Sequence, residues 1–333
     1  MQVDIGLNDK TSEAVVNVDV VRLNDSEALT CRHTLSDHTD GVCALQTYVL
    51  HDKQYLASGS WDGTIKLWDL SENTVTATLT GHQHSVYKLS VYVKNTTPML
   101  ASGSGDKTIN IWDLSSNTLV TTLSGHDGSI YALSVYENNG STVLISGSDD
   151  KTIKLWDVDT YSTIATLQGH TDTITILGVY SHGVKSYLAS DGGDSSIKIW
   201  SLDDHTLVKS IDVDDEEICS LVVVIIDGHH ALASGDSDGT IQVWNVDNYD
   251  CIATINAHSD IIWSLHAVEC GGKVCLVSGS KDKTIKIWDL DNQSVLTTLN
   301  NDSYINAVAV FMNGDRACVA SGDVVGNVKL WME

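Results

Sequence analysis

Tryptophan recurs along this chain at a nearly constant interval. Seven of its nine tryptophans lie at positions 68, 112, 156, 200, 244, 288 and 331, so five intervals are 44 residues and one is 43. A repeat of this length is a single supersecondary unit, which cannot bury its apolar side chains without a neighbour. The 333 residues are therefore predicted to form one array of seven stacked units.

Each recurring tryptophan ends a stretch in which polar and apolar residues alternate, as in SGSGDKTINIW and SGSKDKTIKIW. A period of two is typical of half-buried β-strands, and the Asp-Gly or Asp-Lys pair is typical of a tight turn between two strands. A further apolar strand, such as VYKLSVY, lies upstream of the stretch. Four short strands fit each period, which predicts a ring of four-stranded sheets, a β-propeller.

The Gly-His and Trp-Asp landmarks of these repeats resemble those of the WD40 repeat family. This resemblance implies an all-β fold, a seven-bladed propeller of four antiparallel strands per blade, in a single domain over residues 23–333. Residues 1–22 would be an N-terminal arm without an assigned role. The last repeat lacks an outer strand after Trp331, whereas residues 27–38 align with the outer strands of the first two repeats. We therefore expect this N-terminal strand to close the last blade, as is usual in the family.

In WD40 proteins a histidine, a serine, an aspartate and the tryptophan of one blade form a buried hydrogen-bonded chain. Such a chain satisfies polar groups that are costly to bury unpaired. The same residue types suggest a hydrolase triad or a metal site, but a reaction that needs one nucleophile gains nothing from five buried copies. The resemblance therefore implies five structural sets: His38, Ser58, Asp62 and Trp68; His82, Ser102, Asp106 and Trp112; His126, Ser146, Asp150 and Trp156; His170, Ser190, Asp194 and Trp200; and His258, Ser278, Asp282 and Trp288.

Two repeats depart from this pattern. In the fifth, Asp214 stands where a histidine is expected. In the seventh, which is one residue shorter, Asp302 lies near the histidine position and Val325 replaces the turn aspartate. Because the polar chains cannot form there in the usual way, blades 5 and 7 are predicted to be the weaker ones. An adaptation for binding is the alternative interpretation.

Two tryptophans lie outside the repeat pattern. In WD40 proteins their positions point to the face around the central channel at which the innermost strands begin, here called the top face. Large aromatic side chains on a rigid surface are typical anchors for a partner, although some could merely line the channel wall. The expected partner-binding residues are Trp61, Tyr87, Tyr131, Trp263, Lys281 and Tyr304. On the same face, Lys281 could pair with an acidic group of a partner, and Asp149 or Glu217 with a basic one.

Composition narrows the kind of partner. The formal net charge is −25 and the chain has only three arginines, which opposes binding to nucleic acid or to anionic membranes. The acidic surface would attract basic peptides, and its alternative role is solubility. Seven scattered cysteines without a C-x-x-C pair predict neither disulfides nor a metal site. With no secretory signal, the expectation is an intracellular protein, cytoplasmic or nuclear, that needs no cofactor.

These features favour a non-catalytic scaffold or adaptor that binds proteins or peptides on its top face. One alternative is the substrate-recognition subunit of a ubiquitin ligase, although no WD-x-R motif follows the recurring tryptophans. Another is a reader of basic, histone-like peptides. A propeller hydrolase is a further alternative, for which no unrepeated pair of nucleophile and base is present.

Overall fold

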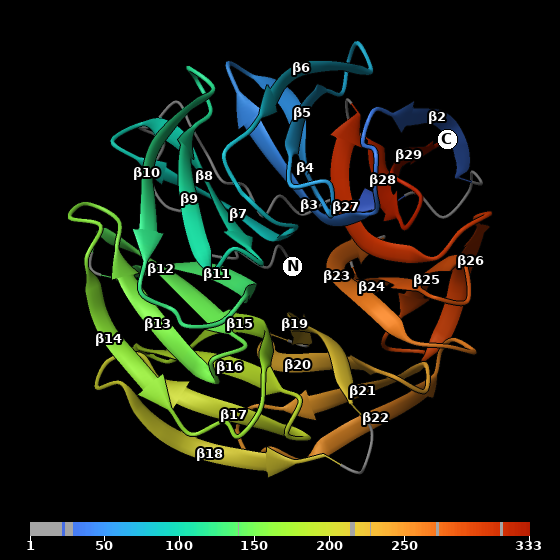
Figure 1. Ribbon diagram of the computed structural model, residues 1–333. Helices are drawn as coiled ribbons and strands as arrows, with labels where there is room; N and C mark the ends of the chain where they lie inside the picture. The colour runs from blue at the N-terminus through green and yellow to red at the C-terminus, as the bar shows by residue number, and fades with distance from the viewer. Residues whose placement is uncertain are drawn as a thin grey trace.

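The protein is a ring of β-sheets around a central channel (Figure 1). The computed structural model describes residues 22–23, 29–138, 140–213, 217–226, 228–270, 273–313 and 316–333. Within these ranges there are strands, turns and loops, so no helix is present that could cross a membrane. Seven blades of four antiparallel strands each confirm the predicted propeller, and the two-residue strand β1 (Arg22–Leu23) pairs parallel with the innermost strand of blade 6. The arm up to residue 21 and Asp214 lie outside the described residues.

The blades are numbered in chain order, and their strands run outward from the channel. The innermost strands are β3 (Val42–Leu50), β7 (Val86–Lys94), β11 (Ile130–Asn138), β15 (Ile174–His182), β19 (Ile218–Ile226), β23 (Ile262–Cys270) and β27 (Ile305–Asn313). The second strands are β4 (Lys53–Ser60), β8 (Thr97–Ser104), β12 (Ser141–Ser148), β16 (Lys185–Gly192), β20 (His229–Asp236), β24 (Lys273–Ser280) and β28 (Arg316–Asp323).

The third strands carry the recurring tryptophans. They are β5 (Ile65–Asp69), β9 (Thr108–Asp113), β13 (Thr152–Asp157), β17 (Ser196–Ser201), β21 (Thr240–Asn245), β25 (Thr284–Asp289) and β29 (Asn327–Met332). The outer strands are β6 (Thr74–Leu79), β10 (Thr118–Ser124), β14 (Thr163–Gln168), β18 (Thr206–Asp212), β22 (Cys251–Asn256), β26 (Ser294–Asn300) and, in blade 7, β2 (Thr30–Ser36).

Tight turns join the second and third strands at the predicted Asp-Gly and Asp-Lys pairs. Gly63 adopts a φ of 79° and Lys107 a φ of 72°, both in the left-handed region. Glycine adopts this conformation without steric cost, whereas lysine does not. Both turns have the same backbone hydrogen bond: the N–H of Gly63 donates to the carbonyl of Ser60, and the N–H of Lys107 to the carbonyl of Ser104, each at 3.2 Å.

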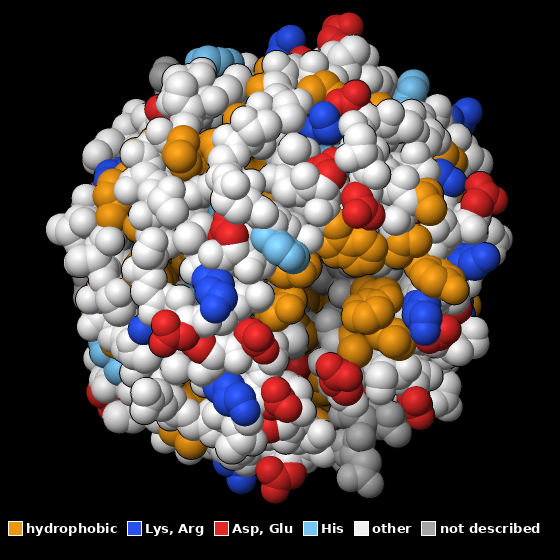
Figure 2. All heavy atoms as spheres, in the orientation of Figure 1, with side chains coloured by type: hydrophobic (Ala, Val, Ile, Leu, Met, Phe, Trp, Pro, Cys, Tyr) orange, Lys and Arg blue, Asp and Glu red, His pale blue; other side chains and the backbone are white. Residues whose placement is uncertain are grey.

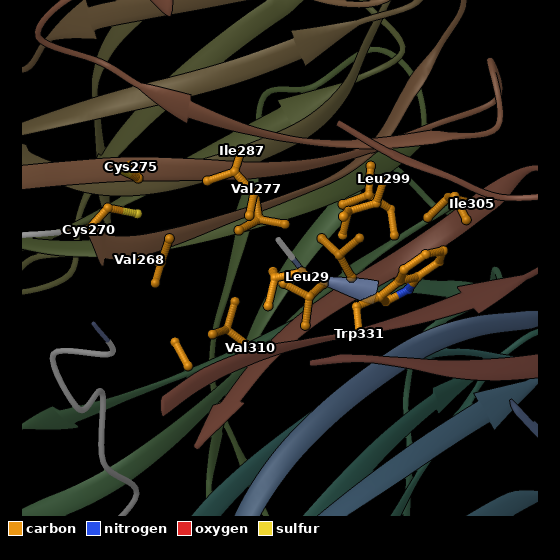
Figure 3. Close-up of a cluster of buried hydrophobic side chains, with 14 residues drawn as sticks. Leu29, Val268, Cys270, Cys275, Val277, Ile287, Leu299, Ile305, Val310 and Trp331 are labelled. Carbon is orange, nitrogen blue, oxygen red and sulfur yellow. The ribbon is translucent and has the colours of Figure 1, made fainter. Parts of the chain in front are cut away.

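The last blade is closed by the N-terminal strand, as predicted. β2 pairs antiparallel with β29, from Thr30 opposite Met332 to Ser36 opposite Asn327. Leu29, just before β2, packs with Trp331 and with apolar side chains of blade 6 in one buried cluster (Figure 3). This cluster therefore connects the segment before β2 and the C-terminal strand β29 to blade 6. Burying one large apolar side chain contributes roughly 1.5–3 kcal/mol to stability.

Glycine allows adjacent blades to approach closely. A Cβ on Gly59 would lie 2.8 Å from Val86 of the next blade, and a Cβ on Gly322 would lie 2.5 Å from Val42. Such distances are too short for side-chain carbons in a packed interior. In the repeat, six of the seven blades have glycine at this position, and blade 4 has Asp191 instead. This exception places an acid where the fold otherwise excludes any side chain.

Candidate functional site

In each set the serine lies in the second strand, the aspartate in the turn that follows, the tryptophan in the third strand, and the histidine in the loop before the innermost strand. In blade 3, Trp156 Nε1 donates to Ser146 Oγ at 2.8 Å, and the same hydroxyl lies 2.7 Å from His126 Nε2. His126 Nδ1 lies 2.7 Å from Asp150 Oδ2. An indole N–H can only donate, so the hydroxyl donates to Nε2 and Nδ1–H donates to the carboxylate. The other four sets have the same three contacts at 2.7–3.0 Å.

Burial lowers the pKa of four of these histidines, His38, His126, His170 and His258, and so favours their neutral form. Burial lowers the pKa of His126, and the hydrogen bond to Asp150 only partly offsets this effect. Burial raises the pKa of the Asp62 carboxyl, but hydrogen bonds from Thr64, His38 and Thr39 outweigh it and bring the pKa to about 2. The five serine side chains are fully buried. A substrate carbonyl cannot reach these hydroxyls, so the geometry supports a structural role and opposes nucleophilic catalysis at them.

Blades 5 and 7 use a different acid to hold their turns. Asp236 Oδ1 accepts a hydrogen bond from the Thr240 backbone N–H at 2.7 Å, and Asp323 Oδ1 accepts one from Asn327 at 2.9 Å. In sequence, Asp236 and Asp323 stand where blade 1 has Ser60. In both blades the turn between the second and third strands is therefore held by an aspartate at the position of Ser60, and not by a residue at the position of Asp62.

The tryptophan contact also persists in these two blades. Trp244 donates to Ser234 at 3.1 Å and Trp331 donates to Ser321 at 2.8 Å. In blade 7 the histidine position is taken by Asn301, whose buried Oδ1 has no hydrogen-bond partner. The sequence-based placement of Asp302 near this position needs correction, because its side chain is fully exposed and lies 3.4 Å from Lys329.

Blade 4 contains a buried acid that the repeat does not require. Asp191 is fully buried, and its Oδ2 accepts a hydrogen bond from Thr175 at 3.2 Å. Its Oδ1 has no hydrogen-bond partner. Burial raises the pKa of this carboxyl well above its ordinary value, and the charges of Asp194 and Glu217 raise it further. A carboxyl held in this way costs stability at neutral pH.

The top face carries the most exposed aromatic side chains among the described residues. Trp61 of blade 1, Trp263 of blade 6 and Tyr304 of blade 7 are 41%, 42% and 40% exposed. Blades 6, 7 and 1 are neighbours in the ring, so these three side chains belong to one part of the face. Figure 2 shows hydrophobic side chains gathered beside the hollow at the centre, where Figure 1 places β23, β27 and β3. We call these three residues the aromatic patch.

The backbone holds the aromatic patch in place. The Trp61 ring covers Gly41, where a Cβ would lie 2.6 Å from the ring and 3.1 Å from the Val324 carbonyl of blade 7. The Trp61 backbone N–H donates to the Gly41 carbonyl at 2.8 Å, and its carbonyl accepts from Ser85 Oγ of blade 2 at 3.3 Å. The Trp61 ring therefore lies so close to Gly41 that no residue with a Cβ fits at position 41 without movement.

Tyr87 and Tyr131 form a stacked pair on blades 2 and 3. Their rings stack with centroids 4.7 Å apart, and both side chains are half-buried. Burial raises the pKa of Tyr131, and the neighbouring Tyr87 raises it further. These two tyrosines therefore contact each other across blades 2 and 3.

The charged residues expected on this face are partly engaged within the chain. Lys281 Nζ lies 3.5 Å from Asp260, and both side chains are more than a third exposed. Lys283 lies over the Tyr304 ring at 5.8 Å from its centroid. Asp149 accepts a hydrogen bond from Thr173 at 2.6 Å, whereas Glu217 is exposed. A partner would have to compete with the Asp260 contact to pair with Lys281.

Comparison with known proteins agrees with this architecture. A family model described as IFT122 first beta-propeller matches residues 89–333, which is more than half of the chain. The chain is a WD40 propeller of the IFT122 first-propeller family. A second model, described as WD domain, G-beta repeat, matches residues 29–69. None of the curated proteins that were searched matches the chain.

WD40 propellers are generally scaffolds for protein interaction and are typically non-catalytic. Within this WD40 propeller, sequence reasoning overlooked two notable residues. Asp191 departs from the repeat as SDG in place of SGS, a signal that comparison of the seven stretches contains. Lys88 interrupts an apolar innermost strand, VYKLSVY, and its position beside the channel becomes evident only from the ring. Val325, 62% exposed, extends the apolar surface of blade 7 at a turn.

Proposed function

We propose that this propeller, residues 23–333, is a non-catalytic scaffold that binds a protein or peptide partner through the aromatic patch on its top face. One observation carries the proposal: Trp61, Trp263 and Tyr304 lie on three neighbouring blades at one side of the channel mouth, each about two-fifths exposed. Tryptophan and tyrosine dominate the residues that contribute most to protein interfaces.

Rigidity supports the same interpretation. Trp61 is fixed by its contact with Gly41, and the carbonyl of Val42 accepts a hydrogen bond from Asn306 of blade 7 at 3.2 Å. Ordering a side chain on binding costs roughly 0.5–1.5 kcal/mol, so a side chain that is already ordered loses less on binding. The aromatic patch is thus suited to anchor an apolar group of a partner.

The test compares partners captured from the native lysate by the wild type and by two triple variants. The top-face variant is Trp61→Ala, Trp263→Ala and Tyr304→Ala. The matched control is Leu119→Ala, Leu207→Ala and Leu296→Ala, three side chains that are 45–47% exposed on outer strands. We expect the top-face variant to lose partners that the control keeps. An unchanged partner set in the top-face variant, or an equal loss in the control, would contradict the proposal.

A basic partner is the form of this proposal that the charge supports. The chain carries a net charge of −25, and Glu217 and Asp149 are exposed on blades 5 and 3. Attraction between exposed charges is screened by salt over about 8 Å at physiological ionic strength. Affinity for a captured partner should therefore fall steeply as salt rises. Salt-independent binding would instead assign the affinity to the apolar contacts.

The non-catalytic part of the proposal has its own test. All five Ser-His pairs are buried, which supports a structural role for them. Purified protein should not turn over generic ester or phosphate substrates. Turnover that co-purifies with the folded protein would contradict this part without affecting the docking proposal.

A further inference from the structure

The contact between blades 4 and 5 differs from the other contacts between adjacent blades, here called seams. At the seam between blades 3 and 4, a Cβ on Gly147 would lie 2.6 Å from Ile174, so glycine lets the second strand of one blade approach the innermost strand of the next. Asp191 takes this position in blade 4. The backbones of β16 and β19 approach each other over a shorter stretch than the corresponding strands at the other six seams. The Asp191 side chain therefore holds blade 5 away from blade 4.

The carboxyl of Asp191 lacks partners in this seam. Thr175 of the same blade donates to Oδ2 at 3.2 Å. Oδ1 is the only carboxylate oxygen among the buried side-chain atoms of the described residues that lack a hydrogen-bond partner. No lysine, arginine or histidine of the described ranges forms an ion pair with Asp191. A buried carboxylate without such a partner is costly.

The ionisable groups around Asp191 do not supply a counter-charge. Described groups in this part of the seam are His170, Asp172, Asp194 and Lys198 of blade 4, and Glu217, Cys219 and Asp236 of blade 5. His170 Nδ1 lies 3.0 Å from Asp194, and Lys198 Nζ lies 3.8 Å from the same carboxylate. Burial, and then the charges of Asp194 and Glu217, raise the pKa of Asp191. The closed seam therefore favours the protonated carboxyl.

The bottom of the same seam, where the innermost strands end, is also weakly held. His230 of blade 5 faces a tyrosine ring of blade 4 with centroids 6.2 Å apart, and its buried Nδ1 has no hydrogen-bond partner. His182 lies 3.4 Å from Asp247, and both side chains are about half exposed. At the equivalent place between blades 2 and 3, Lys94 donates to the Val158 carbonyl at 2.6 Å. Exposed ion pairs contribute little to stability, so neither end of the seam between blades 4 and 5 is strongly closed.

We propose that the ring opens at the seam between blades 4 and 5, and that the ionised carboxylate of Asp191 favours the open form. Opening lets water reach both carboxylate oxygens, which removes the cost of the buried charge. Protonation removes the charge itself and favours the closed form. The carboxyl therefore acts as a pH-sensitive switch in one seam of the ring. This inference does not depend on the proposed docking function, because its tests require no partner.

Hydrogen exchange of the full-length protein, resolved by peptide mass, tests the opening. Asp191→Gly introduces the residue of the other six blades and should slow exchange in β16 and β19 by roughly 5- to 100-fold, which corresponds to the cost of one unsatisfied buried group. Peptides of β8 and β11, at the seam between blades 2 and 3, should not change. Asp203→Asn, which removes an exposed acid of blade 4, is the matched control for net charge and should leave all four strands unchanged. Unchanged exchange in β16 and β19 of Asp191→Gly, or equal slowing in β8 and β11, would overturn the proposal.

A pH series separates the charge of Asp191 from its size, because Asp191→Asn keeps the size of the side chain and removes the charge. The pKa of Asp191 is raised in the closed seam, so opening driven by its carboxylate should grow as the pH rises above about 3.9, the ordinary pKa of an aspartate. After correction for the intrinsic exchange rate, the wild type should exchange faster than Asp191→Asn in β16 and β19, and this difference should increase from about pH 5 to about pH 8. The comparison removes the contribution of the histidines, which are common to both proteins. A difference that stays constant with pH would overturn the switch.

Discussion

Substitution of one buried serine tests how much the polar sets stabilise a blade. Ser146 Oγ accepts the Trp156 N–H at 2.8 Å and donates to His126 Nε2 at 2.7 Å. Ser146→Ala leaves both groups buried and unpaired. Each unsatisfied group costs about 1–3 kcal/mol, so the expected loss of stability in blade 3 is roughly 2–6 kcal/mol.

Blade 7 offers a matched control with the same substitution. Ser321 accepts the Trp331 N–H at 2.8 Å, while Asn301 stands in the histidine position and its Oδ1 is already unpartnered. Ser321→Ala therefore leaves only one newly unpaired group. The expected cost is about 1–3 kcal/mol, half of that in blade 3. The two serines are almost equally buried, so the lost packing is the same.

Hydrogen exchange resolved by peptide mass measures the two variants separately. Ser146→Ala should increase exchange in β12 and β13, and Ser321→Ala should increase it to a smaller extent in β28 and β29. Repeat structures open locally, so exchange in each blade is a better measure than one global transition. Equal increases in the two variants would refute the reasoning, since histidine would then add nothing to the serine–tryptophan contact.

Three further predictions concern the whole ring. Deletion of residues 1–36 removes β2 and should lower the melting temperature, whereas a wild-type melting temperature would contradict closure by this strand. Acidification should lower the urea midpoint. The pKa values of Asp62 and Asp194 are lowered to about 2 and that of His126 below 6.5, so the unfolded chain binds more protons between about pH 6.5 and 2. Asp191, with a raised pKa, acts in the opposite direction as a single group, and a midpoint that rises steadily on acidification would refute the expectation. In the wild type, peptides of blades 5 and 7 should exchange faster than those of blades 2 and 3. Uniform exchange would show that Asp236 and Asp323 fully replace the missing polar contacts.

The fold was predictable because it follows from periodicity. Seven tryptophans at a spacing of 44 or 43 define the number of blades, and a last repeat without an outer strand requires one from elsewhere in the chain. Pairing of β2 with β29 confirms that deduction. These features depend on backbone pairing and on burial of repeated apolar positions, both of which appear directly in a sequence pattern.

Individual side-chain contacts were less predictable. A repeat shortened by one residue does not reveal where the deletion lies, so the position of Asn301 was missed in favour of Asp302. The contact between Lys281 and Asp260 depends on loop geometry, which the spacing does not fix. Lys88 lies in a mostly apolar strand, and its place beside the channel follows from the arrangement of seven innermost strands in a ring.

Closure of blade 7 also determines when the ring can be completed during synthesis. Thr30 pairs with Met332, so 302 residues must be added after the first partner before the second exists. At about 5–20 residues per second, ribosomes need roughly 15–60 s for this stretch. Blades 1 to 6 are each made of four consecutive strands and can form as they emerge. Throughout that interval β2 lacks its strand partner, and an unpaired strand edge is a site at which another chain can pair.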